Sequence, residues 1–369
     1  MGLDTRYRWP LMLLAMLALA AGLDAGLNRI GWRIPMPQPA LAGAHGPLMI
    51  AGALGTVISI ERAVALRRRW PYAAPLLNGL GSVVLILGVP GRLGPLLFVL
   101  GSLVLAFVFV VVLRIHAGKH SVCMAAGTLA LLVGNLLWMI GRPFSLVVFW
   151  WSLFLVLTIA GERLELGRLR QLPANIEYRF MALAALLVVG TGATLAAPDL
   201  GTRIAGAGAL GLAGWLLQYD IARRTIRKGG LTRYIAVCLL SGYGWLGLNG
   251  LTAIIYGFTP AGPIYDAMLH MAFVGFTFAM IFGHAPIILP AVLGLSLRFS
   301  RAFYVHLALL HLSLALRVAG DLAGIGALRR WGGVLNAVTL LMFLLITVWA
   351  AISARAGRNS RECSPSVVH

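Results

Sequence analysis

The sequence predicts an all-α, polytopic membrane protein, and two observations lead to this fold class. The first is composition, because 60% of the 369 residues are hydrophobic and only 11% are charged. The mean hydropathy is +0.90, whereas soluble domains carry about 25% charged residues. The second is that apolar runs recur along the chain at lengths near the ~20 residues that a helix needs to cross a hydrocarbon core.

Twelve apolar runs are predicted to span the membrane. They lie at residues 10–28, 46–66, 73–90, 94–114, 121–141, 145–163, 179–197, 203–221, 233–256, 264–285, 302–320 and 332–353. The first run is not followed by a clear small-residue cleavage site, so we interpret it as a helix and not as a signal peptide. No polar linker divides the chain, which predicts one integral membrane domain over residues 1–369.

Positive charge sets the expected topology. The net charge is +19, and 22 of the 30 Lys and Arg residues fall on one side if both termini lie there, which leaves 8 opposite. By the positive-inside rule this predicts that both termini are cytoplasmic. The basic clusters at 67–69 and 223–228 are then topology signals that also meet anionic lipid head groups. The bilayer is therefore the expected partner, and nucleic acid is not.

A weak internal repeat relates three spans. The second span ends "GTVISIERAVALRRR" and the sixth "VLTIAGERLELGRLR", which share a Thr followed by Glu-Arg. In the tenth span, His284 falls at the depth of Glu61 and Glu162. Because these spans are four apart, the chain is compatible with three four-helix units.

Two histidines are predicted to lie at similar depth in non-consecutive spans. His45 opens the second span, and His270 lies about two turns into the tenth, which runs in the same direction. Neutral imidazoles on facing helices can ligate a haem iron from both sides, each ring being oriented by donating its other N–H to a nearby acceptor. The alternative is that His45 is an interfacial histidine and His270 is a buried one bonded to a carbonyl.

His270 and His284 are expected to act separately. Fourteen residues amount to about 21 Å of helical rise and almost four turns, so both rings would project from one face at opposite depths. Each needs its own partner on another helix. Pro286 predicts that the helix breaks just after His284.

A second cluster is predicted at the cytoplasmic side. It comprises His284, His306 and His311 with Glu61 and Glu162. One interpretation is an imidazole-bound metal such as copper, held by His284 and His306. Another is a proton relay through Glu61, Glu162 and His311. The structural alternative is that Glu61 with Arg62, and Glu162 with Arg163, form ion pairs that the histidines cap.

Motifs for other chemistries are missing from the sequence. There is no Walker loop, no Gly-x-Ser-x-Gly and no His-Glu-x-x-His. A C-x-x-C-H attachment motif is also missing, so a haem would be bound non-covalently. The three cysteines, Cys123, Cys238 and Cys363, show no C-x-x-C spacing and are expected to be structural.

The sequence resembles the NnrS family, bacterial membrane proteins of about twelve helices associated with haem, copper and nitric-oxide metabolism. The resemblance rests on "HMAFVGFTFAMIFGHAPIILP", on "LHLSLALRVAGDLAG" and on the segment that begins at His45. It implies a bacterial inner-membrane protein in nitric-oxide stress or denitrification, an oxidoreductase or ligand-binding role, and an electron donor or nitric oxide as partner. Where NnrS proteins often carry a second histidine near the first, this chain has Pro47 and Met49.

The placement of His45 and His270 is also similar to the low-spin haem site of the haem-copper oxidase catalytic subunit. That resemblance implies that both are axial ligands. The chain lacks a histidine in 145–163 and a histidine pair in 179–197, so a haem-copper centre that reduces dioxygen is not expected.

Three functions follow as hypotheses. The first is a haem-binding protein of NnrS type. The second is a cofactor-free, proton-coupled secondary transporter that uses Glu61, Glu162 and His284, with "LSGYGWLGLNG" as the one segment where a helix is expected to break near the midplane. The third is an assembly subunit of a respiratory complex. The sequence leaves the oligomeric state open.

Overall fold

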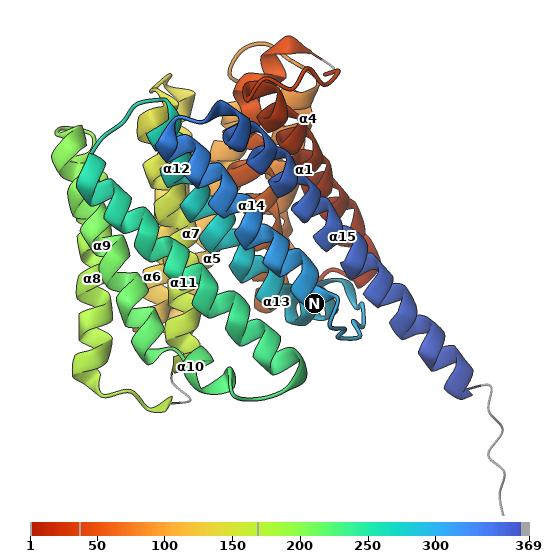
Figure 1. Cartoon of the computed structure of the whole chain (residues 1–369). Coiled ribbons are helices and arrows are strands. Elements are labelled where there is room, and N and C mark those ends of the chain that lie inside the picture. Colours follow the sequence, from red (N-terminus) through yellow and green to blue (C-terminus); the bar gives the residue numbers. More distant parts are fainter. Residues whose placement is uncertain (1, 37, 168–169, 363–369) are drawn as a thin grey trace, which may run out of the picture.

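The computed structural model describes residues 2–36, 38–167 and 170–362, and the side chains up to residue 354. Within these residues the chain is all α-helical, with no strand (Figure 1). Eleven of the described helices are long and apolar enough to cross a membrane, and a shorter apolar helix, Trp70–Ile86, lies between the second and third of them. The predicted multi-pass fold is confirmed. Eleven of the twelve predicted spans coincide with these long helices, and the predicted span 73–90 coincides with the shorter one.

The helices follow one another with short connections. Their bounds are α1 Trp9–Arg29, α2 His45–Pro47, α3 Gly55–Leu66, α4 Ala73–Ile86, α5 Leu93–Ile115, α6 Lys119–Met139, α7 Phe144–Gly167, α8 Ala174–Ala193, α9 Pro198–Tyr219, α10 Ala222–Thr225, α11 Gly230–Tyr256, α12 Pro263–His270, α13 Ala279–Leu293, α14 Phe303–Ala323 and α15 Gly326–Glu362. Short 3₁₀ turns cover Thr5–Tyr7, Pro39–Ala44 and Trp70–Tyr72. π-helical segments, Leu48–Leu54 and Met271–Phe278, join α2 to α3 and α12 to α13.

The helix that carries His284 does not break where the sequence predicts. α13 continues through Pro286 and Pro290 to Leu293 and ends at Gly294, which is left-handed with φ 67°. Each proline removes one backbone hydrogen bond, but proline is tolerated in membrane helices when neighbours satisfy the freed groups. The expected break after His284 is therefore wrong.

The helical geometry between His270 and His284 also differs from the prediction. Met271–Phe278 is π-helical, so the residues per turn exceed the 3.6 of an α-helix over this stretch. The expectation that both rings share one face assumed a regular α-helix, and it does not hold for this backbone.

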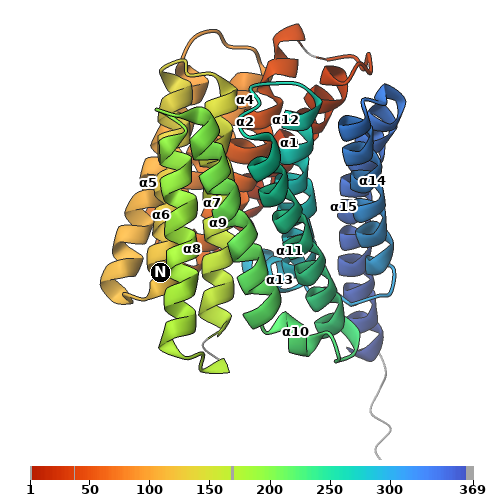
Figure 2. The same ribbon diagram turned by 60° about the vertical axis from the view of Figure 1, so that its left-hand side comes forward.

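Glycines let several helices approach closely. A Cβ added at Gly190 would lie 2.2 Å from the backbone nitrogen of Ala205, which places α8 against α9. A Cβ at Gly250 would lie 2.6 Å from the carbonyl oxygen of Gly206, which places α11 against α9. Small residues at such crossings are the usual basis of helix packing in lipid. α14 and α15 form a pair at one edge of the bundle (Figure 2).

The first and last membrane-crossing helices meet at one cavity. Trp9 near the start of α1 and Ile352 in α15 line the same cavity, and α15 runs down to the lower end of the bundle in Figure 1. α2 and α12 lie at the opposite, upper end (Figure 2). Cys123 and Cys238 are buried free thiols, whereas Cys363 lies outside the described residues.

Candidate haem-binding site

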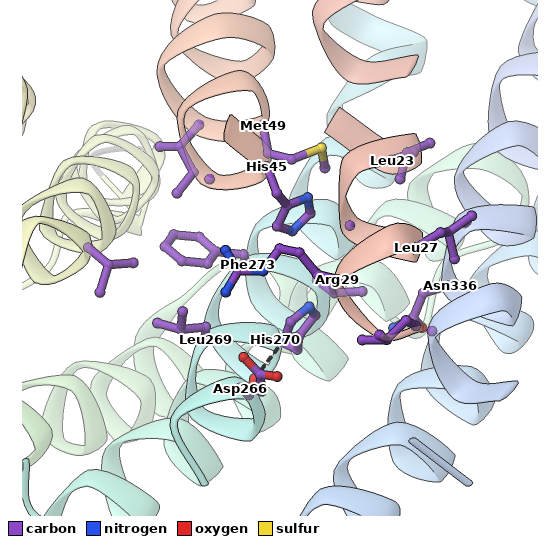
Figure 3. A pocket seen from close by; sticks show the side chains of 18 of the residues that line it. Leu23, Leu27, Arg29, His45, Met49, Asp266, Leu269, His270, Phe273 and Asn336 are labelled. Atoms are coloured by element: carbon purple, nitrogen blue, oxygen red, sulfur yellow. Dashed lines mark hydrogen bonds between the residues drawn. The ribbon is translucent and has the colours of Figure 1, made fainter. Parts of the chain in front are cut away.

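His45 and His270 line one cavity, which we call the histidine cavity. It measures about 190 Å³ and lies between α1, α2, α7, α12 and α15. Its walls are largely apolar, with Leu27, Met49 and Phe273 among them. Figure 3 shows both imidazoles in this pocket, one from α2 and one from α12. The structure thus brings together the two histidines that the sequence pairs.

The ring of His45 is oriented by α1. Its Nδ1 lies 2.7 Å from the carbonyl oxygen of Gly22. A carbonyl only accepts hydrogen bonds, so Nδ1 carries the proton and donates, and Nε2 of the neutral ring keeps its lone pair. Glycine is required beside it, because a Cβ at Gly26 would lie 2.7 Å from Cε1 of His45.

His270 is oriented in the same way by its own helix. Its Nδ1 donates to the carbonyl oxygen of Asp266 at 2.6 Å, one turn earlier in α12. Its Nε2 is therefore also the nitrogen with a free lone pair. A histidine that ligates a metal through one nitrogen usually donates through the other to a carbonyl or carboxylate. Both rings have this arrangement.

The backbone changes to a π-helix close after each of these histidines. One π segment, Leu48–Leu54, begins three residues after His45, and the other, Met271–Phe278, begins directly after His270. π segments are rare and frequently occur at functional sites, because they turn side chains away from the regular helical positions. The two segments lie in the two helices that carry the paired histidines.

Charged side chains form one wall of the cavity. Asp321 has a fully buried side chain and lies 3.0 Å from Nε of Arg329 and 3.8 Å from Nε of Arg317. Asp266 pairs with Arg329 and lies 3.9 Å from Nη2 of Arg317. The two arginines and two aspartates balance. Arg29 also lines the cavity and forms no ion pair with the side chains that the structure describes, so this wall carries one excess positive charge.

Glu61, Glu162 and His284 line a second cavity, which we call the carboxylate cavity. It measures about 670 Å³, is mostly apolar and lies between α1, α3, α7, α13 and α15. Leu54 lines both cavities, so they are neighbours. The three residues that the repeat aligns are therefore brought to one place, while the division into three four-helix units stays a prediction.

The ion pairs at this cavity differ in part from the predicted ones. Arg62 contacts both Glu61, at 3.1 Å, and Glu162. Arg163 pairs instead with the buried Asp220, its Nε 2.8 Å from Oδ2, so the predicted pairing of Glu162 with Arg163 is replaced. With two carboxylates on one guanidinium, this cluster carries one excess negative charge when all three groups are ionised.

His284 is held by a carbonyl and lies near Arg163. Its Nδ1 donates to the carbonyl oxygen of Met280 at 2.6 Å. Its Nε2 lies 3.4 Å from Nη1 of Arg163. A guanidinium only donates, so Nε2 faces a positive charge. This surrounding disfavours a second positive charge, such as a metal ion, on the ring.

His306 and His311 line neither cavity. His306 is buried among Phe282, Phe303 and Phe343, and its Nε2 lies 3.0 Å from the hydroxyl of Tyr234. His311 accepts a hydrogen bond from the Trp245 indole at 3.0 Å. Within the described part of the chain, no three His, Cys, Asp or Glu side chains gather in a way that could hold a metal ion. His306 therefore does not share a cavity with His284, its predicted partner in a metal site. His311 does not share one with Glu61 and Glu162, its predicted partners in a proton relay.

Sequence reasoning missed most of the charged wall. Arg317 and Asp321 lie one turn apart in α14, and Arg329 and Asp266 join them from α15 and α12. One sequence feature could have indicated this cluster. Asp266 and Asp321 lie within a predicted span or at its edge, where an ionised side chain is unfavourable unless it has a partner of opposite charge. Arg163 and Asp220 also lie at the edges of predicted spans, so the same argument applies to them.

A family model matches most of the chain. No curated protein matches the chain. The family model described as "Domain of unknown function (DUF8744)" matches residues 8–352, from the end of the first 3₁₀ turn into the last membrane-crossing helix. This range includes both histidines and all the charged side chains discussed above, and the chain belongs to the DUF8744 family.

Proposed function

We propose that the protein binds haem non-covalently in the histidine cavity, with His45 and His270 as axial ligands. The observation that carries this proposal is the shared orientation of the two rings. Both line one cavity, and both use Nδ1 to donate to a backbone carbonyl, at 2.7 Å and 2.6 Å. Two imidazoles prepared in this way offer two Nε2 atoms to a metal between them.

The rest of the cavity suits an amphipathic macrocycle with carboxylate groups. Apolar side chains line most of it, and three arginines, Arg29, Arg317 and Arg329, also line it. Arginine is well matched to carboxylates in geometry and charge. The excess charge of Arg29 would be neutralised by a propionate.

Haem entry requires the cavity to enlarge. The cavity of about 190 Å³ is below the roughly 300–1,000 Å³ typical of ligand pockets. In the view of Figure 3, the Arg29 side chain lies between the two imidazoles. Arg29 is exposed and has a long, flexible side chain, so its displacement costs little. A movement of this side chain out of the cavity would enlarge the cavity and allow the guanidinium to bind a haem propionate.

Bound haem would supply an iron that changes between the ferric and ferrous states. With His45 and His270 both holding it, the group would be suited to electron transfer, and nitric oxide would bind only if one of the two histidines left. Together with the resemblance to NnrS, this supports a role in nitric-oxide stress or denitrification, as a membrane oxidoreductase or ligand-binding protein. We further propose that the protein lies in a bacterial inner membrane with both termini in the cytoplasm, following its positive charges.

Cofactor analysis of the purified protein tests this proposal. The full chain, expressed with added haem precursor, is expected to contain about one haem per chain by pyridine haemochrome assay. His45→Ala and His270→Ala should lose most of it. His311→Ala is the matched control, because His311 is a partly buried histidine that lines neither cavity. A wild-type protein without haem, or equal loss in all three variants, would overturn the proposal.

The carboxylate cavity supports a second candidate, a cofactor-free proton-coupled transporter. Its excess negative charge and its volume of about 670 Å³ suit a proton and a small solute. The predicted helix break is not found, however, because α11 is continuous from Gly230 to Tyr256. Proton uptake by vesicles that contain the haem-free protein tests this candidate. Uptake that disappears in Glu61→Gln but survives in His45→Ala would favour it over haem binding.

A further inference from the structure

Cationic side chains surround a cleft at the lower end of the bundle. This basic cleft measures about 520 Å³ and is lined by Arg170, Gln218, Arg223, Arg224, Arg227 and Lys228. Gln218 belongs to the last turn of α9, and four of the cations lie in α10 and the turn before α11. The cleft therefore has five positive charges and one amide, and no acidic residue lines it.

The nearest acid in the sequence does not neutralise these charges. Asp220 is 3% exposed, and its carboxylate accepts hydrogen bonds from Arg163, the Tyr243 hydroxyl and the Ala222 amide. Across the side chains that the structure describes, Arg223, Arg224, Arg227 and Lys228 form no ion pair. The positive potential of the cleft is therefore available to a ligand.

Buried contacts fix one wall of the cleft. The guanidinium of Arg170 donates to the carbonyl oxygens of Tyr219 and Asp220, the latter at 3.3 Å. Carbonyls orient this guanidinium without cancelling its charge. The Asp220 carboxylate also accepts from the Ala222 amide at 2.7 Å, which holds the start of α10 against the end of α9. The cleft is thus part of the folded bundle.

The cleft lies just beyond three membrane-crossing helices. These helices are Phe144–Gly167, Pro198–Tyr219 and Gly230–Tyr256, and the cationic residues follow or precede their ends directly. Residues in this position lie at the level of the lipid head groups. A lipid of the bilayer can therefore reach the cleft directly, without passing through the aqueous phase.

We propose that the basic cleft binds the phosphate of an anionic phospholipid head group. Arginine guanidinium groups bind phosphate oxygens through two parallel hydrogen bonds. Basic pockets between membrane helices are known to hold such head groups. A free phosphate offers the same chemistry from the aqueous phase, so the test must separate the two sources. This site is independent of the histidine cavity and of the haem proposal.

Lipid binding by charge-matched variants tests the site. The full-length protein is placed in phosphatidylcholine nanodiscs with increasing phosphatidylglycerol, and bound anionic lipid is counted by native mass spectrometry. Arg223→Gln/Arg224→Gln/Arg227→Gln should lower the apparent affinity at least about tenfold at low salt. The control Arg67→Gln/Arg68→Gln/Arg69→Gln removes the same charge from exposed arginines that do not line the cleft. This control removes only the general attraction of exposed arginines for head groups, so the affinity should stay within about twofold of wild type.

Three further arms make the result decisive. Replacing the same three arginines of the cleft by lysine should retain most of the binding, which separates loss of charge from loss of folding. Millimolar inorganic phosphate at constant ionic strength should not displace the lipid. Displacement would assign the cleft to free phosphate and overturn the lipid source. Equal losses in the two glutamine triple variants, or no retained anionic lipid in wild type, would overturn the site itself.

Discussion

The imidazole of His45 is held by Gly22, whose carbonyl oxygen accepts a hydrogen bond from Nδ1 at 2.7 Å. This contact ties the second membrane-crossing helix to the first and leaves Nε2 of the ring with a free lone pair. A second glycine one turn later, Gly26, leaves the space that the ring occupies. The position of His45 therefore depends on two small residues of α1 as much as on its own helix.

The first prediction concerns this space. Gly26→Ala places a Cβ 2.7 Å from Cε1 of His45, so the ring must move. We expect haem affinity to fall by roughly tenfold or more, as when a group that orients a ligand is removed, measured by haem transfer to apomyoglobin. Gly214→Ala is the control, because a Cβ there meets nothing within 4 Å. Unchanged haem affinity in Gly26→Ala would show that His45 is not a ligand.

The second prediction concerns the charge of Arg29. Removing a positive charge near the iron stabilises the ferric state, so Arg29→Gln should lower the reduction potential by on the order of tens of millivolts. A spectroelectrochemical titration measures this shift. Arg33→Gln removes the same charge from an exposed residue that does not line the cavity, and its potential should stay near the wild-type value. Equal shifts in both variants would count against contact between Arg29 and the cofactor.

The third prediction concerns nitric oxide. If both axial positions are filled, nitric oxide can bind only after one histidine has dissociated. Dissociation then limits the rate, so binding to the ferrous wild type should be slow and independent of the nitric-oxide concentration. In haem-reconstituted His270→Ala, one position is open, and stopped-flow traces should show faster binding that increases with concentration. Similar concentration-dependent rates in both proteins would mean that His270 does not occupy an axial position.

The fourth prediction concerns stability. Arg163 and Asp220 are 4% and 1% exposed in their side chains, with Nε 2.8 Å from Oδ2. Asp220→Asn leaves a buried guanidinium without its counter-charge, which should cost about 3–5 kcal/mol. Denaturant unfolding in mixed micelles measures this cost. Asp4→Asn breaks an exposed pair and should cost less than about 1 kcal/mol. A small effect at Asp220 would indicate that water reaches this pair.

The membrane-crossing helices could be predicted because each of them is encoded locally. A run of about 20 apolar residues is sufficient to predict a span, and each predicted span coincides with a helix. The local rules fail in two places. Pro286 lies inside α13 because tertiary packing outweighs the local preference of proline. The π segments after His45 and His270 carry no sequence signal that distinguishes them from α-helix.

The candidate site could be predicted only in part. Equal depth in parallel spans was enough to pair His45 with His270, because depth follows from position along a span. Contacts that depend on rotation about the helix axis were not accessible. His306 lies near His284 in predicted depth but is buried among aromatic rings and contacts Tyr234. The contact of Arg329 with Asp266 depends on the packing of α15 against α12 and α14, which no local pattern specifies.

The ferric absorption spectra of His45→Ala and His270→Ala test the central claim most directly. If each histidine supplies one axial ligand, wild type should give a low-spin Soret band. Each variant reconstituted with haem should give a high-spin spectrum, and added imidazole should restore the low-spin form. A wild-type protein without a Soret band after expression with sufficient haem would contradict the account, as would a low-spin spectrum that persists in both variants.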